Sequence, residues 1–344
     1  MRHMRQGIVI LACLVGIIAI LAGAGSAQNV VRVGEVGIVA DAPFYIAVEK
    51  GYFKERGIEA TLERFASAAA ATAPLSAGQL EVVGGGISPA LFNAFARAFP
   101  IRVVAARSRD FPGNTSDTLI IRSDLKDQIR RFADLKGRKI AINAAGSPLV
   151  YMLGKMLESD GLSLKDVEVV YMPFPDMGPA FASKAIDAGT SVEPFVTQFQ
   201  DRGYAFPWKR SSDVIRNPLF EVAVVLYNRD WAEKNPRAAR DFMVAYIRAS
   251  RDYHDAMYGG KTRPEVIDIL MKRTPVKDRA LYDRMQWGHI DPNGTVGKES
   301  LREQQDWYAR QGLVPKKVDI DEIVDERYIK YAVEQLGAVP AKRP

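Results

Sequence analysis

Short apolar runs rich in β-branched residues alternate along this chain with segments of helical hydrophobic spacing. This alternation is typical of a mostly parallel α/β sheet, because parallel strands are usually joined by helical crossovers. Seven runs have the length and composition of strands: 30–36, 79–84, 101–106, 118–122, 139–142, 167–172 and 222–227. Helices are predicted at 44–56, 147–160 and 236–257. The sequence therefore predicts the α/β class.

The segment 236–257 is the clearest helix. Pro236 suits the first helical position, where its missing N–H costs nothing, and Asn235 before it is a good cap. Aromatic and apolar residues from Phe242 to Met257 recur on one face, as in a helix that packs on a core. This helix is predicted to be structural.

The N-terminus has the order of a secretory signal peptide. Arg2 and Arg5 precede an apolar run at 8–22, and small residues then end at Ala27, which predicts cleavage before Gln28. The run of about 15 residues is short for a membrane span, which needs ~20. An uncleaved anchor is the alternative. Cleavage before Cys13, as in a lipoprotein, is disfavoured because it would leave 14–22 exposed on the mature protein.

Composition excludes several classes of function. Cys13 is the only cysteine, so a mature chain from residue 28 can have no disulfide and no cysteine metal site. Removal of the two N-terminal arginines lowers the formal charge of +6 to roughly +4. Acids and bases are interleaved without a basic stripe, which argues against nucleic acid. No paired-histidine spacing and no nucleophile turn is present, so no metal, cofactor or catalytic residue is predicted.

A weak internal repeat predicts two similar halves. The segment 75–81 leads to Pro89, and the segment 181–187, about 106 residues later, leads to Pro194. Each reads as a helix end, a turn, a short strand and a loop that opens the next helix. A mature chain of about 317 residues is comfortable for two domains. No linker separates them, so each lobe is expected to be discontinuous in sequence.

Three loops that open helices are candidate binding loops. Ligands of open α/β sheets sit beyond the carboxyl ends of strands, and helix N-termini offer free N–H groups that suit anions. The loops are 41–45, 84–89 and 143–148. Their candidate ligand-binding residues are Asp41, Pro43, Phe44, Tyr45, Gly85, Gly86, Ser88, Gly146 and Ser147.

Charged and aromatic residues complete the predicted site. Arg107 and Arg109 follow the strand at 101–106, and either one can reach an acidic group; Arg107 is included among the predicted site residues. Glu193, beside Pro194, is a candidate acceptor, and Phe174 is a candidate apolar wall. A helix cap is the alternative role for Asp41. Acids beside bases favour a solute with both donor and acceptor groups over a bare anion.

The segment 42–59, APFYIAVEKGYFKERGIE, is the most distinctive motif of the chain. It resembles the nitrate/sulfonate/taurine group of ABC-transporter substrate-binding proteins, which also has relatives that bind pyrimidine precursors of thiamine. Further matches follow in the order of that family, at 76–84, 133–141, 146–148, 185–188 and 193–194. The resemblance covers roughly 31–255, and nothing after Gly259 matches a motif.

The resemblance implies a type II periplasmic-binding-protein fold with two α/β lobes. Crossover strands are expected near 118–121 and 222–226. We therefore expect a signal peptide at 1–27, a first lobe from 28–118 and 223–344, and a second lobe from 119–222. Solute would bind in the cleft between the lobes and close them about a hinge.

The function that the resemblance implies is the periplasmic solute-binding component of an ABC importer in a Gram-negative bacterium. Its partners would be a small polar or anionic organic solute (sulfonate, carboxylate or pyrimidine-like) and an inner-membrane permease with its cytoplasmic ATPase. A monomer is expected. A ligand-sensing domain that works with a membrane receptor is the alternative. A thiamine-pathway enzyme shares the fold but carries a cysteine-rich motif that this chain lacks, so no enzyme activity is expected.

Overall fold

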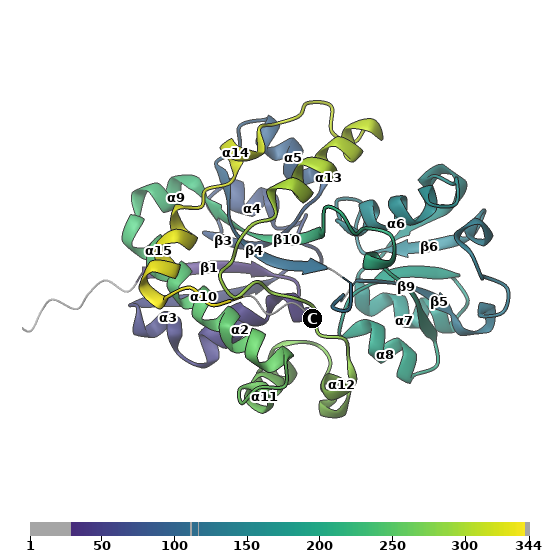
Figure 1. Cartoon of the computed structure of the whole chain (residues 1–344), viewed down its shortest axis with the longest axis horizontal. Helices are drawn as coiled ribbons and strands as arrows, with labels where there is room; N and C mark the ends of the chain where they lie inside the picture. The colour runs from purple at the N-terminus through teal and green to yellow at the C-terminus, as the bar shows by residue number, and fades with distance from the viewer. Residues whose placement is uncertain (1–28, 111, 116, 341–344) are drawn as a thin grey trace, which may run out of the picture.

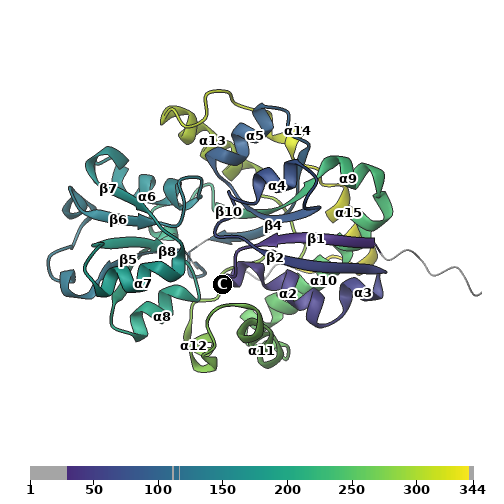
Figure 2. The same ribbon diagram turned by 180° about the vertical axis from the view of Figure 1, so that it is seen from behind.

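The computed structural model describes residues 29–110, 112–115 and 117–340. The predicted signal peptide at 1–27, with Cys13, lies outside these described residues. Within them, no helix combines the length and the apolar character needed to cross a membrane. Two lobes of strands and helices lie side by side in both ribbon views (Figures 1 and 2).

Each lobe is built on a five-stranded sheet. The first sheet has the order β2-β1-β3-β10-β4, and the second has the order β7-β6-β8-β5-β9. The strands of the first sheet are β1 (Asn29–Glu35), β2 (Ile58–Arg64), β3 (Val82–Gly86), β4 (Ile101–Asp110) and β10 (Phe220–Asn228). Those of the second are β5 (Thr118–Arg122), β6 (Lys139–Ile142), β7 (Glu168–Tyr171), β8 (Ala188–Ser191) and β9 (Ala205–Arg210).

The two sheets share one topology. In the first, β1 pairs parallel with β2 and β3, and β10 runs antiparallel between β3 and β4. In the second, β6 pairs parallel with β7 and β8, and β5 runs antiparallel between β8 and β9. The repeats at 75–81 and 181–187 lead to β3 and β8, which hold equivalent places. The predicted likeness of the two halves is therefore confirmed.

Helices cover both sheets. The α-helices before β10 are α2 (Ala42–Glu49), α3 (Tyr52–Glu55), α4 (Thr72–Ser76), α5 (Pro89–Ala96), α6 (Leu149–Glu158), α7 (Phe174–Ala182) and α8 (Phe195–Asp201). Those after it are α9 (Arg229–Lys234), α10 (Pro236–Met257), α11 (Arg263–Arg273), α12 (Arg279–Arg284), α13 (Lys298–Arg310), α14 (Ile320–Ile323) and α15 (Arg327–Leu336). Short 3₁₀ helices are η1 (Val39–Asp41), η2 (Ser123–Leu125), η3 (Phe132–Leu135), η4 (Leu164–Asp166) and η5 (Ser211–Asp213).

The predicted helices differ from the observed ones chiefly at their ends. α10 has the predicted bounds, although the Asn235 side chain donates to the carbonyl of Trp231 instead of capping α10. The segment 44–56 is two helices rather than one, because Gly51 takes a left-handed φ of 74° that ends the first. β4 is longer than predicted, so Arg107 and Arg109 lie within the strand and not after it.

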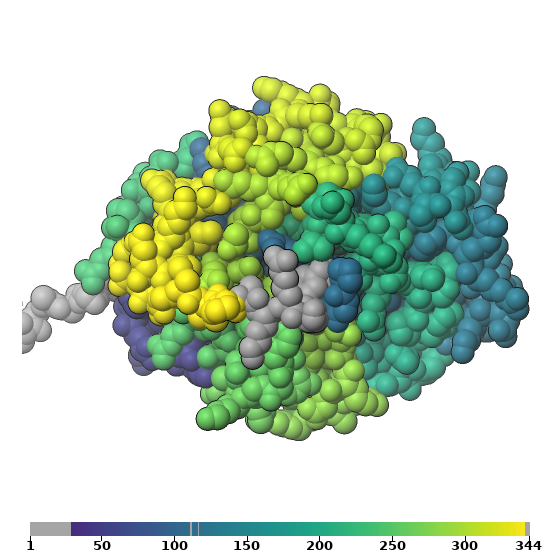
Figure 3. Space-filling model, viewed as in Figure 1, coloured from purple at the N-terminus to yellow at the C-terminus, as the bar shows by residue number. Residues whose placement is uncertain are grey.

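Two buried cores hold the lobes. One lies under α2, α3 and α10 of the first lobe, where the Phe53 ring stacks on Phe242 with centroids 4.5 Å apart. The other core is continuous across both lobes. At their boundary the Tyr151 ring of α6 contacts Phe220 of β10 and Trp307 of α13. In Figure 3 the yellow-green atoms of the α13 region accordingly meet the blue-teal atoms of the second lobe.

The chain passes between the sheets at two places. It leaves β4 at Asp110 and starts β5 at Thr118, and it returns between the end of β9 at Arg210 and the start of β10 at Phe220. The strands expected to cross between lobes each pair within a single sheet, β5 in the second and β10 in the first. Each of these strands therefore directly follows one of the two crossings, which are completed by the segments that join the strands.

Candidate functional site

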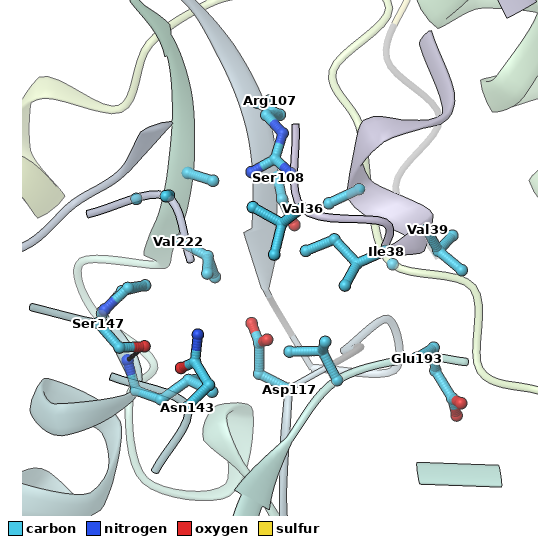
Figure 4. Close-up of a pocket in the computed structure, with 18 of the residues that line it drawn as sticks. Val36, Ile38, Val39, Arg107, Ser108, Asp117, Asn143, Ser147, Glu193 and Val222 are labelled. Atoms are coloured by element: carbon cyan, nitrogen blue, oxygen red, sulfur yellow. Dashed lines mark hydrogen bonds between the residues drawn. The ribbon is translucent and has the colours of Figure 1, made fainter. Parts of the chain in front are cut away.

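A cavity lies between the two lobes, beyond the ends of strands from both sheets (Figure 4). Its first-lobe wall is formed by Val36, Ile38, Val39, Ala40, Ala68, Gly86, Arg107, Ser108, Val222, Ala223, Tyr253, Gly288 and Ile290. Its second-lobe wall is formed by Asn143, Ser147, Pro148, Leu149, Phe174, Val192 and Glu193, and Asp117 borders it from the segment that joins β4 to β5. The cavity volume is about 60 Å³. At ~10–15 Å³ per water, this is room for a few waters or a small solute.

Arg107 is the cationic side chain of the wall, and it is already paired. It is 2% exposed, and its Nη2 donates to Asp41 Oδ1 at 2.5 Å. The other oxygen of Asp41 accepts from the backbone N–H groups of Val36 and Ile38. A Cβ at Gly84 would lie 2.7 Å from Arg107 Nε, so glycine allows the guanidinium to lie against β3. Asp41 thus anchors Arg107 and the loop after β1, and lies behind the cavity wall.

Asp117 directs a carboxyl group into the cavity, as Figure 4 shows. It is 1% exposed and hydrogen-bonded to Asp110, which in turn accepts from the Ser211 hydroxyl at 2.5 Å. Burial and the negative charge of Asp110 raise the pKa of Asp117 well above its ordinary value, and Arg107 only partly opposes this. The two carboxyls therefore share a proton rather than both ionising.

Asn143 and Ser147 face Asp117 from the loop that opens α6 (Figure 4). The Ser147 hydroxyl accepts from the backbone N–H of Leu149 at 3.2 Å and so caps this end of α6. Asn143 Oδ1 is buried and has no hydrogen-bond partner among the described residues. This side of the cavity offers an amide and the N-terminal end of a ten-residue helix.

Glu193 borders the cavity, but its carboxylate turns away from the centre (Figure 4). Its oxygens accept from the backbone N–H and hydroxyl of Thr197, at 3.1 and 2.9 Å, and from the backbone N–H of Gln286. Burial raises the pKa of Glu193 to about 7, against these hydrogen bonds, which lower it. Glu193 therefore holds the start of α8 and the segment before Trp287.

Five of the predicted site residues meet at the cavity: Gly86, Arg107, Ser147, Phe174 and Glu193. Arg109, the alternative to Arg107, is bound to Glu221 at 2.5 Å and is not part of the wall. Residues two apart share a face of a regular strand, but the register of β4 with β10 shifts beside Ser108 and Arg109, and this irregularity breaks the alternation there.

The other seven lie elsewhere: Asp41, Pro43, Phe44, Tyr45, Gly85, Ser88 and Gly146. Phe44 is fully buried against Tyr246, and the Tyr45 hydroxyl donates to Glu35 at 2.6 Å. Pro43 is buried in the first turn of α2, and Ser88 caps α5 by accepting from Leu91 N–H.

The predicted glycines serve contacts within the protein. Gly85 faces Leu226 on the neighbouring strand. A Cβ at Gly86 would be 2.8 Å from Pro148 Cδ, and one at Gly146 would be 2.9 Å from Ala69 Cβ. Each of the latter contacts joins one lobe to the other. The absence of side chains at these two positions therefore lets the lobes approach closely around the cavity.

Asp117 and Asn143 are the site residues that the sequence analysis did not select. A usable signal was present, because Asp117 directly precedes the predicted strand 118–122 and Asn143 directly follows the predicted strand 139–142. Tyr253 was assigned to the core of α10; it also borders the cavity, and its hydroxyl donates to Gly288 O at 2.9 Å. Across the described part of the chain, no group of three His, Cys, Asp or Glu side chains is placed to hold a metal ion.

Sequence comparison connects this chain to known proteins. The pattern of the family described as NMT1/THI5 like matches residues 40–256. A Brucella abortus protein named as a binding protein is 30% identical over 226 residues, which are 64% of this chain and 66% of that protein. The match thus spans just under two thirds of that relative's length. A Bacillus subtilis protein named as an aliphatic sulfonates-binding protein is 23% identical over 96% of this chain and 98% of its own length.

Solved structures share the fold. The alkanesulfonate-binding protein SsuA from Xanthomonas axonopodis pv. citri, bound to MOPS, has a TM-score of 0.71 and 21% identity, covering 87% of this chain and 98% of its own. The desulfurization enzyme DSZB has a TM-score of 0.67 and 17% identity, covering 90% of this chain and 100% of its own. At these identities the likeness shows the two-lobed α/β fold, which confirms the predicted fold class.

Replacement of Glu193 by Gln should change how stability depends on pH. Because its folded pKa is raised from 4.5 to about 7, Glu193 stays protonated in the native state where the unfolded chain ionises. The free energy of unfolding should therefore fall as pH rises from 4.5 to 7, by about 3 kcal/mol at most at ~1.4 kcal/mol per unit. Denaturant unfolding from pH 5 to 8 should show that the free energy of unfolding of Glu193→Gln increases relative to that of the parent protein as pH rises.

The exposed Glu59→Gln change is the matched control, and it should track the parent protein at each pH. A difference between Glu193→Gln and parent that stays constant from pH 5 to 8 would contradict the assignment of a raised pKa to Glu193.

Proposed function

The chain belongs to the NMT1/THI5-like family, and from this premise we propose that it is the solute-binding component of an ABC importer. It captures a small polar or anionic organic solute, of sulfonate, carboxylate or pyrimidine-like chemistry, and delivers it to a permease. The relatives named for sulfonate binding support this assignment. The family membership also confirms the resemblance carried by the segment 42–59.

The observation that carries the proposal is the cavity between the lobes. It combines a mostly apolar wall with a small number of convergent polar groups, from Arg107, Asp117 and Asn143. This is the composition of sites that bind small molecules. Buried polar atoms that lack partners in the protein are satisfied when a solute supplies them.

Closure of the lobes about the solute is supported by how tightly they meet. Pro148 of the second lobe lies against Gly86 of the first, and Gly146 lies against Ala69 and Ala90. Residues of both lobes also line the cavity, so a bound solute would contact both. We propose that the lobes, taken as 28–118 with 223–344 and as 119–222, separate at the two crossing segments to admit and release it.

The remaining parts of the proposal concern location and partners. Residues 1–27 would direct export to the periplasm of a Gram-negative cell, where a monomer would dock its closed lobes on an inner-membrane permease driven by a cytoplasmic ATPase. Binding rather than catalysis is supported by the relatives named as binding proteins. The fold likeness to DSZB carries no activity by itself.

A solute screen should identify ligands and detect closure. Thermal-shift measurements with sulfonates, aliphatic and aromatic carboxylates and pyrimidines should find solutes that raise the melting temperature, since binding adds ~2.7 kcal/mol at 100 Kd. Small-angle scattering should then show a smaller radius of gyration with a saturating hit than without it. If no solute of these classes shifts the melting temperature, the proposed function fails. An unchanged radius at saturation would contradict closure.

Replacement of Gly146 by Ala should weaken binding by keeping the lobes apart. The added methyl would lie 2.9 Å from Ala69 Cβ, and overpacking of this kind costs ~1–3 kcal/mol, or roughly 5- to 150-fold in Kd. The melting temperature of the unliganded protein should stay within a few degrees of the parent. Calorimetry with the best hit of the screen measures the loss.

The double variant Gly146→Ala/Ala69→Gly restores the space and should recover most of the affinity. Parent-like binding by Gly146→Ala alone would show that solute is held without this contact.

A further inference from the structure

The most unusual polar group of the cavity is the Asp117 carboxyl. One side of it is hydrogen-bonded to Asp110, and its Oδ2 has no hydrogen-bond partner among the described residues. The residue is 1% exposed, so bulk water does not reach it in this closed arrangement. Figure 4 shows the carboxyl pointing into the cavity from the second-lobe side.

An acid in this position is costly unless a partner reaches it. A buried polar atom without a hydrogen bond destabilises the protein, and a second acid beside it adds repulsion. Arg107 stabilises the negative charge of the pair only in part: its Nη2 is bound to Asp41 at 2.5 Å, and its Nε is buried without a hydrogen-bond partner among the described residues. Asp117 Oδ2 has no partner among the described residues and points into the cavity, so a donor bound there would satisfy it.

The charge balance of the wall favours a hydrogen-bond donor over an anion. Among the described residues of the wall, Arg107 is the only cation, and Asp41 offsets it. Asp117 and Asp110 share one proton, so their pair still has one negative charge beside the cavity, whereas Glu193 points its carboxyl away from the centre. An ion that only accepts hydrogen bonds, such as nitrate or a simple alkanesulfonate, would leave Asp117 Oδ2 unsatisfied and add negative charge beside it.

Asn143 fits the same chemistry. Its amide lies on the same side of the cavity as the Asp117 carboxyl in Figure 4, and an amide can both donate and accept. A solute with an N–H donor beside an acceptor atom can donate its N–H to Asp117. Asn143 can then accept from the solute's donor or donate to its acceptor. The Ser147 hydroxyl accepts from Leu149 N–H and keeps its own O–H as a donor for an acceptor elsewhere on the solute.

We propose that Asp117 determines specificity by accepting a hydrogen bond from an N–H group of the solute, so that the natural solutes carry an amine, amidine, amide or ring N–H. The inference rests on the proposed function, because it names the solute class of the same cavity. Asp117 would therefore distinguish, by affinity, between solutes of one chemical class that differ only in one N–H donor.

Matched pairs of probes test the inference. Calorimetry on protein refolded free of co-purified solute compares taurine with ethanesulfonate, β-alanine with propionate, and 4-aminopyrimidine with pyrimidine. Within a pair that binds, the N–H member should bind at least about tenfold more tightly, a difference of ~1.4 kcal/mol. Isethionate, with a hydroxyl in place of the taurine amine, separates an N–H requirement from a preference for any donor.

Two variants of Asp117 assign the effect to this residue. Asp117→Leu removes the acceptor and should lower affinity for the N–H probe about tenfold or more while leaving its donor-free partner nearly unchanged. Asp117→Asn keeps a hydrogen bond to Asp110, so its affinity for the N–H probe should lie between those of Asp117→Leu and the parent. The matched substitution at the exposed Asp127, Asp127→Asn, lies away from the cavity wall and should leave the affinity for both members of each pair unchanged. Melting temperatures of all variants check that they fold.

The outcomes separate this inference from the proposed function. If ethanesulfonate or propionate binds the parent as tightly as its N–H partner, or if isethionate equals taurine, the inference is wrong while the importer role stands. Equal losses for both members of a pair in Asp117→Leu also overturn it. If no probe and no solute of the wider screen binds the parent, both the proposed function and this inference are wrong.

Discussion

The buried ion pair between Arg107 and Asp41 organises the binding side of the first lobe. The Arg107 and Asp41 side chains are 3% and 0% exposed, and charges so deeply buried persist only when paired. Asp41 also holds the backbone at Val36 and Ile38, which form part of the cavity wall. Loss of either partner would leave the other charge buried and alone, at a cost of ~3–5 kcal/mol.

The same pair determines what the cavity can recognise. Because Asp41 offsets Arg107, the wall has no unopposed cation among its described residues, and the acid pair of Asp110 and Asp117 becomes the dominant polar feature. Contacts between the lobes then determine how Arg107 and Asp117 are placed relative to the second-lobe wall. The Trp307 indole N–H donates to Glu158 at 2.8 Å from α13 to α6, so the part of the chain after Gly259, which matches no motif, helps hold the lobes together.

The sequence predicted the elements of the fold better than the contents of the site. Hydrophobic period and composition are local properties, and they located α10 to the residue and the seven selected strands to within a few residues. The short strand β8, in contrast, is only four residues, AGTS, with little β-branched signal. The site depends on which face of a strand or helix a side chain leaves from, and on which segments of the other lobe lie opposite. Thus Phe44 and Tyr45, next to a binding loop in sequence, are core, whereas Asp117 faces the cavity from the segment that crosses between the lobes.

The central claim is that solute enters and leaves a cavity that the two lobes close. A cross-link between the lobes tests it most directly. The Cβ of a residue at 146 would lie 3.3 Å from the Ala90 Cβ, close to the ~3.5–4.5 Å of disulfides, so Ala90→Cys with Gly146→Cys should lock the lobes when oxidised. Calorimetry with the best solute of the screen should then show no binding to the oxidised unliganded protein and recovery on reduction, with each single cysteine variant unaffected by oxidation. Equal binding by the locked and reduced forms would contradict the claim.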